Sequence, residues 1–202
     1  MIVEEYSQKF YGESIDNETI IKENEFIMNY YNKINFDNKS CCDYGCGSGF
    51  WTYYLSKLCS NTIGTDISDE SINFCNENFA SVKFVTLEQA LMQRYDYIFV
   101  NWVLQEITDE INFKITLDRL SSICKEKGRL FIVDNISPDE SKTQLYSKTE
   151  YGSVYSYKTG EKIRFFGIDQ LKIIFLKIGF ELKEYYEFEE SFLLVLEKSI
   201  VN

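Results

Sequence analysis

The sequence predicts an α/β fold in which a mostly parallel sheet carries helices on both faces and ends in an antiparallel hairpin. Two observations support this prediction. Short apolar runs alternate with amphipathic helical patterns between residues 40 and 134, which is the order expected of repeated strand–helix units. After residue 168, one more helical pattern leads into two strand-like runs separated only by a short acidic turn, which is typical of a hairpin.

The first elements follow one another regularly. A leading helix is expected after Asp16 or Asn17, either of which can cap its first turn, with Ile20, Ile27 and Ile34 on one face. Strands are expected at about 40–44, 61–66, 82–86, 95–101 and 129–134, and helices at 49–59, after Ser68, and at 110–126 with Gly128 as the stop.

The last elements build the hairpin. A final helical stripe runs from Leu171 to Ile178 and ends before Gly179, because glycine tolerates the left-handed conformation that closes many helices. Strands are then expected at about 180–187 and 191–197.

Residues 135–167 interrupt this pattern. They contain the one proline of the chain, four of its tyrosines and no sustained periodicity. A long irregular segment inside a compact chain is usually a binding element or a lid. Since this segment follows a strand at the carboxyl edge of a parallel sheet, we expect a loop-rich lid over the substrate. The alternative is a disordered surface insert.

Length and composition predict a single cytoplasmic domain over residues 1–202. Hydrophobic residues make up 45% of the 202 positions, which is enough for a substantial core. The N-terminus lacks the pattern of a signal peptide, and no apolar run approaches about 18 residues, so no membrane partner is expected. Free thiols without a leader favour the cytoplasm.

Charge and residue types argue against other classes. The net charge is −11 without a basic stripe, which argues against a nucleic-acid partner because phosphate neutralisation supplies much of that affinity. The chain has no histidine, and its six cysteines form no C-x-x-C pair, so no metal is expected. Both a monomer and a homodimer fit the composition.

The most informative segment is the glycine-rich turn that follows the first expected strand. Its pattern is acidic-x-G-x-G-x-G, from Asp43 to Gly49, and a helix begins at once. A dinucleotide fingerprint would need a glycine where Phe50 stands, so the turn suits a nucleoside with an amino-acid tail and no pyrophosphate. Asp66 lies 21 residues after Gly45 at the end of the second strand, where a carboxylate commonly accepts hydrogen bonds from ribose.

These segments resemble the first motifs of the class I S-adenosylmethionine-dependent methyltransferases. Residues 94–101, 102–107 and 127–134 resemble, in the same order, the family's fourth strand, the segment after it and the fifth strand. The resemblance spans about residues 38–135. It implies a Rossmann-like, seven-stranded sheet, S-adenosyl-L-methionine as the cofactor with S-adenosyl-L-homocysteine as its product, and methyl transfer as the reaction. It also implies that residues 1–36 form an N-terminal cap over the cofactor pocket, with plain packing of the leading helix as the alternative.

The resemblance also implies which residues bind the cofactor. Glu88, next to the backbone of Leu87, is expected at the adenine amino group, with Gln89 as the alternative. For Asp66, the alternative to ribose binding is a helix N-terminal charge. The expected cofactor-binding residues are Asp43, Gly45, Cys46, Gly47, Asp66, Ile67, Leu87, Glu88 and Asn101.

The residues after the fourth strand bear on the acceptor. Many small-molecule relatives place a histidine where Gln105 or Glu106 stands in this chain. A carboxylate there suits an ammonium group, since it can hold the cation and receive its proton. We expect Glu106 and Asn135 to act in catalysis, and Trp102, Gln105 and Tyr151 to bind the substrate. The alternatives are a solvated position for Glu106 and core packing for Trp102.

The expected function is methyl transfer to a nitrogen or oxygen of a small molecule, with an amine favoured. Trp102-Val103 and Asp134-Asn135 also resemble the protein α-N-terminal methyltransferases, so a protein N-terminus is an alternative acceptor. A non-catalytic module that binds S-adenosylmethionine is a further alternative. Arg164 and Lys162 are either ligands of an anionic substrate group or ordinary surface charges.

Overall fold

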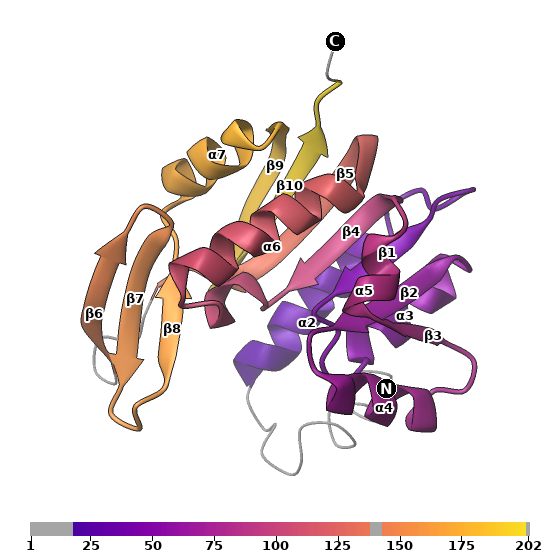
Figure 1. Cartoon of the computed structure of the whole chain (residues 1–202), viewed down its shortest axis with the longest axis horizontal. Coiled ribbons are helices and arrows are strands. Elements are labelled where there is room, and N and C mark those ends of the chain that lie inside the picture. The colour runs from indigo at the N-terminus through magenta and orange to yellow at the C-terminus, as the bar shows by residue number, and fades with distance from the viewer. Residues whose placement is uncertain (1–17, 138–142, 201–202) are drawn as a thin grey trace.

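A computed structural model of the chain describes residues 18–137 and 143–200. Seven strands form one sheet in the order β3-β2-β1-β4-β5-β10-β9 (Figure 1). Strands β1 to β5 run parallel to one another, and β10 pairs antiparallel with both β5 and β9. The predicted sheet and its C-terminal hairpin are therefore confirmed, whereas the predicted helix caps Asp16 and Asn17 lie outside the described residues.

The elements have the following bounds in chain order. They are α2 (Glu18–Tyr31), β1 (Cys41–Tyr44), α3 (Phe50–Leu58), β2 (Thr62–Asp66), α4 (Asp69–Asn78), β3 (Lys83–Thr86), α5 (Leu87–Leu91), β4 (Tyr95–Asn101), a 3-10 turn η1 (Leu104–Glu106), α6 (Glu110–Ile123), β5 (Cys124–Asn135), β6 (Thr143–Thr149), β7 (Gly152–Tyr157), β8 (Lys162–Phe165), α7 (Ile168–Lys177), β9 (Phe180–Phe188) and β10 (Ser191–Lys198).

Helices cover both faces of the large sheet (Figure 1). Along β4, Ile98 and Val100 pack in the core on the side of α6 and α7, whereas Phe99 packs in the core on the side of α2 and α3. This alternation follows from the two-residue period of a strand. The rings of Phe99 and Phe131 stack with their centroids 4.8 Å apart, so neighbouring strands share one aromatic layer beneath α2.

Helix α2 lies over the carboxyl half of that face. Its residues Ile27 and Tyr31 are fully buried against the aromatic layer. The Tyr31 hydroxyl donates a hydrogen bond of 2.8 Å to Oδ1 of Asn101, the last residue of β4. The N-terminal helix is thereby anchored at the edge of the sheet where the strands end.

Two local predictions were wrong. The helix expected to run to residue 126 ends at Ile123, and Gly128 lies inside β5 instead of stopping a helix. A Cβ atom at Gly128 would lie 2.7 Å from the carbonyl oxygen of Lys125, so close packing explains this glycine. The short helix α5 was not expected, and it begins with a capping box in which Thr86 and Gln89 satisfy each other's backbone N–H groups.

Residues 143–165 form a small antiparallel sheet in the order β6-β7-β8, not the loop-rich segment that was expected. Figure 1 shows it beyond the end of the β4 arrow, beside α6 and α7. Its strands are short and polar on most positions, and only Val154, Ile163 and Phe165 are buried apolar side chains among them. Such faint alternation is hard to recognise in the sequence.

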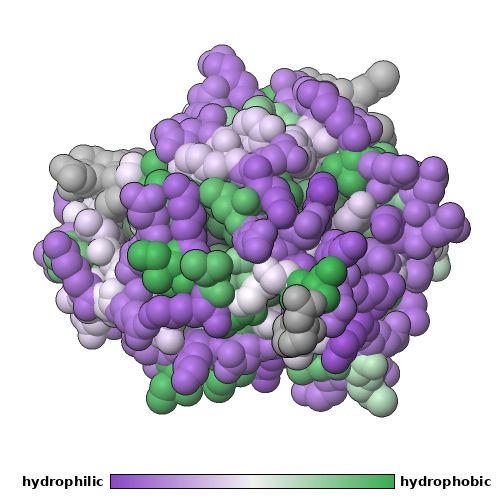
Figure 2. Space-filling view, turned by 90° about the horizontal axis from the view of Figure 1, so that it is seen from above, coloured by the Kyte–Doolittle hydropathy of each residue, from purple (hydrophilic) through white to green (hydrophobic). Residues whose placement is uncertain are grey.

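Polar and charged residues dominate the surface seen in Figure 2, and the hydrophobic residues on that face form separate patches between them. All six cysteines are free and buried. Within residues 18–137 and 143–200, no helix combines the length and the hydropathy that a transmembrane span requires.

The shared aromatic layer predicts where the fold is most sensitive. Replacing Phe131, which is 1% exposed, by alanine is expected to lower the free energy of unfolding by about 3–5 kcal/mol because it opens a cavity between α2 and the sheet. Leu176→Ala is the control, since Leu176 is 64% exposed and its loss is expected to change stability by at most about 0.5 kcal/mol. Urea unfolding measures both variants, and equal losses would contradict the prediction.

Candidate functional site

A cavity of about 540 Å³ opens at the carboxyl ends of β1, β2 and β4. Strand β1 has β2 on one side and β4 on the other, and ligands of open parallel sheets bind where the strand order reverses. Six predicted site residues line this cavity: Gly45, Asp66, Ile67, Leu87, Trp102 and Glu106.

The glycine turn reaches the cavity at Gly45. The N–H groups of Gly45 and Cys46 both donate to the Thr65 carbonyl oxygen, at 2.8 and 2.9 Å, which joins the turn to β2. Gly45 has a φ of 78°, and a Cβ atom there would lie 2.5 Å from Cγ2 of Val103. Gly47 has a φ of 50°, and a Cβ atom there would meet no atom within 4 Å. The turn is therefore packed tightly at Gly45 and open at Gly47.

Asp66 holds the turn from the end of β2. Its Oδ2 accepts from the N–H of Gly47 and its Oδ1 from the N–H of Ser68, both at 2.9 Å. A carboxylate oxygen accepts more than one hydrogen bond. Asp66 can therefore position the glycine turn and still accept hydrogen bonds from ribose hydroxyls.

The adenine side of the expected site differs from the prediction in its details. Leu87 is buried and lines the cavity, and Ile67 lines it while 82% exposed, so both offer apolar surface to a flat ring. Glu88 is exposed in the first turn of α5 and is not a lining residue. The alternative, Gln89, is occupied in the capping box with Thr86.

Helix α6 provides a wall that was not foreseen. Asn112, Thr116 and Arg119 line the cavity, and Tyr44 of β1 lies beside them. The sequence contains a signal for this wall, because these polar positions recur at helical spacing next to the buried stripe that includes Phe113.

The end of β4 brings a strained residue to the cavity. Trp102 has a φ of 54°, a left-handed conformation that is uncommon for a residue other than glycine. Its Nε1 donates to Oγ of Ser191 at 3.3 Å, and that hydroxyl donates to Oδ1 of Asn135 at 3.3 Å. The neighbouring Asn101 has a buried Nδ2 without a partner among the described residues.

Gln105 connects the two predicted catalytic residues. Its Nε2 donates to Oε1 of Glu106 at 3.4 Å, and its Oε1 accepts from the N–H of Asn135 at 3.1 Å. Glu106 is exposed and lines the cavity, whereas Gln105 is buried. Gln105 therefore lies behind the cavity wall, where it orients Glu106.

Asp134 is a buried acid that the sequence analysis did not select. Its Oδ1 accepts from the N–H of Gln105 at 3.4 Å, and its Oδ2 has no partner among the described residues. Burial raises the pKa of this carboxyl well above its usual value, and the charge of Glu106 raises it further. Its position directly before Asn135, at the end of an apolar strand, is the signal that the sequence offered.

The remaining predicted residues lie away from the cavity lining. Asp43 is buried and accepts a hydrogen bond of 2.6 Å from Oγ1 of Thr52. Burial, together with the charge of Asp66, raises the pKa of its carboxyl to about 7. Cys46 is buried against α4, and the Tyr151 ring packs on Phe113 with 5.3 Å between ring centroids.

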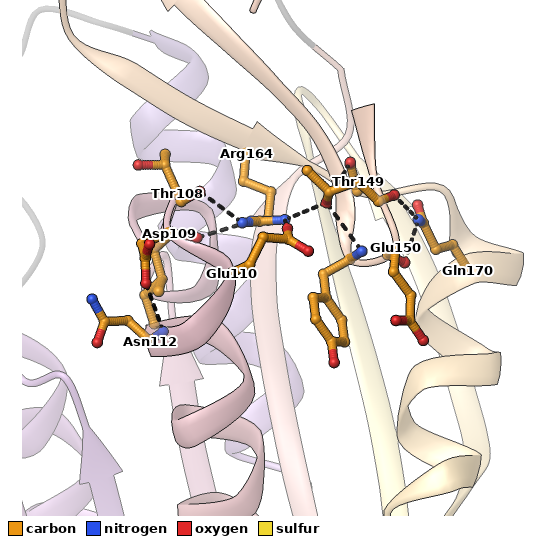
Figure 3. A network of polar contacts seen from close by, with 11 residues as sticks. Thr108, Asp109, Glu110, Asn112, Thr149, Glu150, Arg164 and Gln170 are labelled. Carbon is orange, nitrogen blue, oxygen red and sulfur yellow. Dashed lines mark hydrogen bonds and ion pairs between the residues drawn. The ribbon is translucent and has the colours of Figure 1, made fainter. Parts of the chain in front are cut away.

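Arg164 is neither a surface charge nor a free anion ligand. Its side chain is fully buried, and its guanidinium lies over the ring of Phe113 at 4.7 Å. It donates to the carbonyl oxygens of Ile107 and Thr108 at 2.8 and 2.9 Å, and both residues line the cavity (Figure 3).

The same guanidinium reaches the small sheet and the start of α6. Nη1 donates to Oγ1 of Thr149 at 2.9 Å and pairs with Glu110 at 3.1 Å (Figure 3). Arg164 therefore connects three segments: the cavity wall after η1, the N-terminus of α6 and the β6–β7 hairpin. Lys162, by contrast, is exposed, with its Nζ 3.6 Å from the centroid of the Tyr146 ring.

The cavity fits a nucleoside that carries an amino-acid tail. Gly45 and Asp66 line it, and the Asp66 carboxylate has free acceptor capacity. Gly47 and Asn101 lie next to lining residues and do not line the cavity themselves, and the buried Nδ2 of Asn101 has no partner among the described residues. Ile67 and Leu87 supply apolar surface for a base. Among the described residues, no group of three or more histidine, cysteine or acidic side chains is arranged to hold a metal ion.

Asp43 is expected to make stability depend on pH. The pKa of Asp43 is about 7 in the folded chain and about 4 in the unfolded chain, so the folded chain binds the proton more tightly. The stability that this proton contributes is fully present below pH 4 and is lost as pH rises to 7. Asp43→Asn stays neutral and can still accept from Thr52. As pH rises from 4 to 8, the free energy of unfolding of this variant is expected to increase by about 4 kcal/mol relative to that of the original chain. Urea unfolding at several pH values measures this gain, and a difference that does not change with pH would contradict it.

Arg164 is expected to stabilise the cavity wall. Arg164→Met removes charge-assisted hydrogen bonds to two carbonyl groups of the cavity wall and is expected to cost about 3 kcal/mol of unfolding free energy. It should also speed amide hydrogen exchange in residues 106–112. The control Lys177→Met breaks the exposed ion pair with Glu150 and should change stability by less than about 1 kcal/mol. Unchanged exchange in Arg164→Met would show that the wall does not depend on this side chain.

Comparisons with known proteins agree with this geometry. A family model described as "Methyltransferase domain" matches residues 18–185. An uncharacterized methyltransferase of Schizosaccharomyces pombe is 22% identical over 140 residues, which are 56% of this chain and 47% of that protein. The matched region thus spans about half the length of this curated relative.

Solved structures share the fold at low sequence identity. The 1,6-didemethyltoxoflavin-N1-methyltransferase of Burkholderia thailandensis, solved with its substrate and S-adenosylhomocysteine, has a TM-score of 0.65 at 15% identity, over 98% of this chain and 87% of that one. The amino pentose methyltransferase CalS10 of Micromonospora echinaspora was solved with bound S-adenosylmethionine. It has a TM-score of 0.64 at 12% identity, over 98% of this chain and 97% of that one.

These findings confirm the resemblance recognised in the sequence. The family model covers most of the chain, and the solved neighbours share its fold. The chain therefore belongs to the methyltransferase-domain family, with the fold of solved S-adenosylmethionine-dependent methyltransferases.

Proposed function

We propose that this methyltransferase acts on an amine nitrogen of a small molecule. The observation that carries the proposal is the Glu106 carboxylate, which lines the cavity directly after β4 and is oriented by the buried Gln105. Asp66 and Asp109 also line the cavity, against one cation, Arg119. This excess of carboxylates favours a positively charged acceptor.

The proposed cofactor contacts use the glycine turn and the ends of β2 and β4. Gly45 and Gly47 would face the amino-acid tail, Asp66 the ribose, and Ile67 with Leu87 the base. Asn101 would present its unpaired Nδ2 to the tail carboxylate. S-adenosylmethionine supplies the methyl group as a sulfonium, and the residues of the chain have to align the acceptor with it.

Glu106 is proposed to hold the acceptor ammonium and to accept its proton, so that the nitrogen lone pair becomes free for transfer. The Trp102 ring lines the same space and would attract the cation through its π-face. Asn135, held by the Ser191 hydroxyl and by Gln105, would orient the acceptor. Orientation of this kind contributes several kcal/mol to many transfer reactions.

The outer segments complete the proposal. We assign residues 1–202 to one methyltransferase domain, with residues 1–36 as a cap and 135–167 as the substrate lid that includes β6–β8. The lid assignment rests on Arg164, which ties the small sheet to the cavity wall. Tyr151 would then act from the lid. Two structural neighbours described as an N1-methyltransferase and an amino pentose methyltransferase act on small molecules, which agrees with this acceptor class.

Glu106→Gln tests the proposal. With a panel of metabolite amines and radiolabelled S-adenosylmethionine, the original chain is expected to methylate at least one amine, and Glu106→Gln to lower kcat/KM by about 10²-fold or more. The dissociation constant of S-adenosylhomocysteine should stay within about twofold by calorimetry, since the variant keeps the cofactor contacts.

Glu126→Gln is the matched control, because Glu126 is exposed at the far end of β5 and should leave turnover unchanged. Methylation of alcohols or of short peptides alone would overturn the acceptor class. In the peptide case the acceptor would be a protein N-terminus. Tight cofactor binding without turnover on any acceptor would favour a binding module.

A further inference from the structure

A second cavity, of about 660 Å³, lies on the α2 side of the sheet, at the edge where β4 and β5 begin. Its floor is formed by β4, β5, β9 and β10, and its wall by the second half of α2 and residues 33–39. No described residue lines both cavities. We name this cavity the amino-edge cleft, and it is separate from the methyltransferase site.

Aromatic rings supply much of the cleft surface. Tyr30, Tyr97 and Tyr186 line it, and the rings of Tyr30 and Tyr186 lie 5.6 Å apart, tilted by 57°. Tyr97 is held edge-on against Phe131 at 5.6 Å, so its position is set by the core. Tyr186 remains 39% exposed. The cleft therefore presents fixed ring surfaces that a flat aromatic ligand can contact.

The carboxylates of the cleft are already neutralised or hydrogen-bonded. Asp96 forms an ion pair with Lys125 at 2.7 Å. Partial burial alone would raise the pKa of the Asp96 carboxyl, but this ion pair helps to keep it at about 2. Glu197 pairs with Arg129 at 3.2 Å, and Glu184 accepts a tyrosine hydroxyl at 2.7 Å. The charges of Asp96 and Glu197 are therefore compensated by cations of the fold, whereas Glu184 is hydrogen-bonded but keeps its charge.

Three lysines of the cleft are not compensated in this way. Lys33, Lys39 and Lys127 form no ion pair with any residue in the described ranges, and Lys39 only lies 5.6 Å from the centroid of the Tyr97 ring. In a chain with a net charge of −11, this group is a local excess of positive charge beside aromatic surface. An anionic group on a ligand would complement it.

We propose that the amino-edge cleft binds a small molecule in which a flat aromatic ring carries a phosphate or carboxylate group. The ring would pack against the tyrosines, and the anion would lie among the three lysines. The cavity volume is within the range of small-molecule sites, about 300–1,000 Å³. The proposal does not depend on the identity of the methyl acceptor.

The test uses a fluorescent nucleotide, N-methylanthraniloyl-AMP, with protein that is first saturated with S-adenosylhomocysteine to fill the methyltransferase site. Saturable binding is expected. AMP and 4-hydroxybenzoate, as separate competitors, show whether the phosphate or the carboxylate form is preferred. The better competitor of AMP and 4-hydroxybenzoate is the reference. Adenosine alone, which has the ring without the anion, and inorganic phosphate alone, which has the anion without the ring, should each compete at least tenfold less well.

Charge reversal locates the site. The double variant Lys33→Glu/Lys127→Glu is expected to weaken binding at least tenfold. The control Lys114→Glu/Lys172→Glu has the same net charge, places both changes on exposed positions of α6 and α7, and should stay within twofold. Absence of saturable binding, or equal weakening in both variants, would overturn the proposal. Urea unfolding confirms that each variant is folded before it is titrated.

Discussion

The candidate functional site depends on the contact between the glycine turn and the segment that follows β4. Gly45 lies so close to Val103 that a single added carbon would overlap it, and Asp66 fixes the other side of the turn through Gly47. This contact sets the distance between the glycine turn and the residues that follow β4. Trp102 occupies a left-handed conformation at the same place, which is a form of strain that often marks functional sites. The glycine turn and the segment after β4 are thus one packed unit.

The small sheet extends this unit outward. A fully buried guanidinium is costly unless its donors are used, and Arg164 uses four of its five N–H groups on two carbonyl groups, a hydroxyl and a carboxylate. The network reaches α7 as well, since Gln170 donates to the Glu150 carbonyl oxygen at 2.8 Å (Figure 3). Movement of β6–β8 would therefore be transmitted to the cavity wall, which is the mechanical property that a lid requires.

Most of the fold could be predicted because its signals are local. The alternation along β4 and the stripe of α6 follow directly from burial on one side, and the position of Asp66 follows from the end of β2. The small sheet was missed because β6 is mostly exposed and the three strands contain few buried apolar side chains. Gly128 was misread because glycine serves both helix ends and close packing. Asp134 and the polar face of α6 escaped selection since their roles come from contacts between distant segments.

The six buried thiols give this molecule a built-in reporter. A thiol reacts with an alkylating reagent only as an accessible thiolate, so labelling of these cysteines requires the structure to open. Cys46 lies in the glycine turn, Cys75 in α4 and Cys124 at the start of β5. The order in which they become modified would therefore map which part of the chain opens first, without any introduced probe.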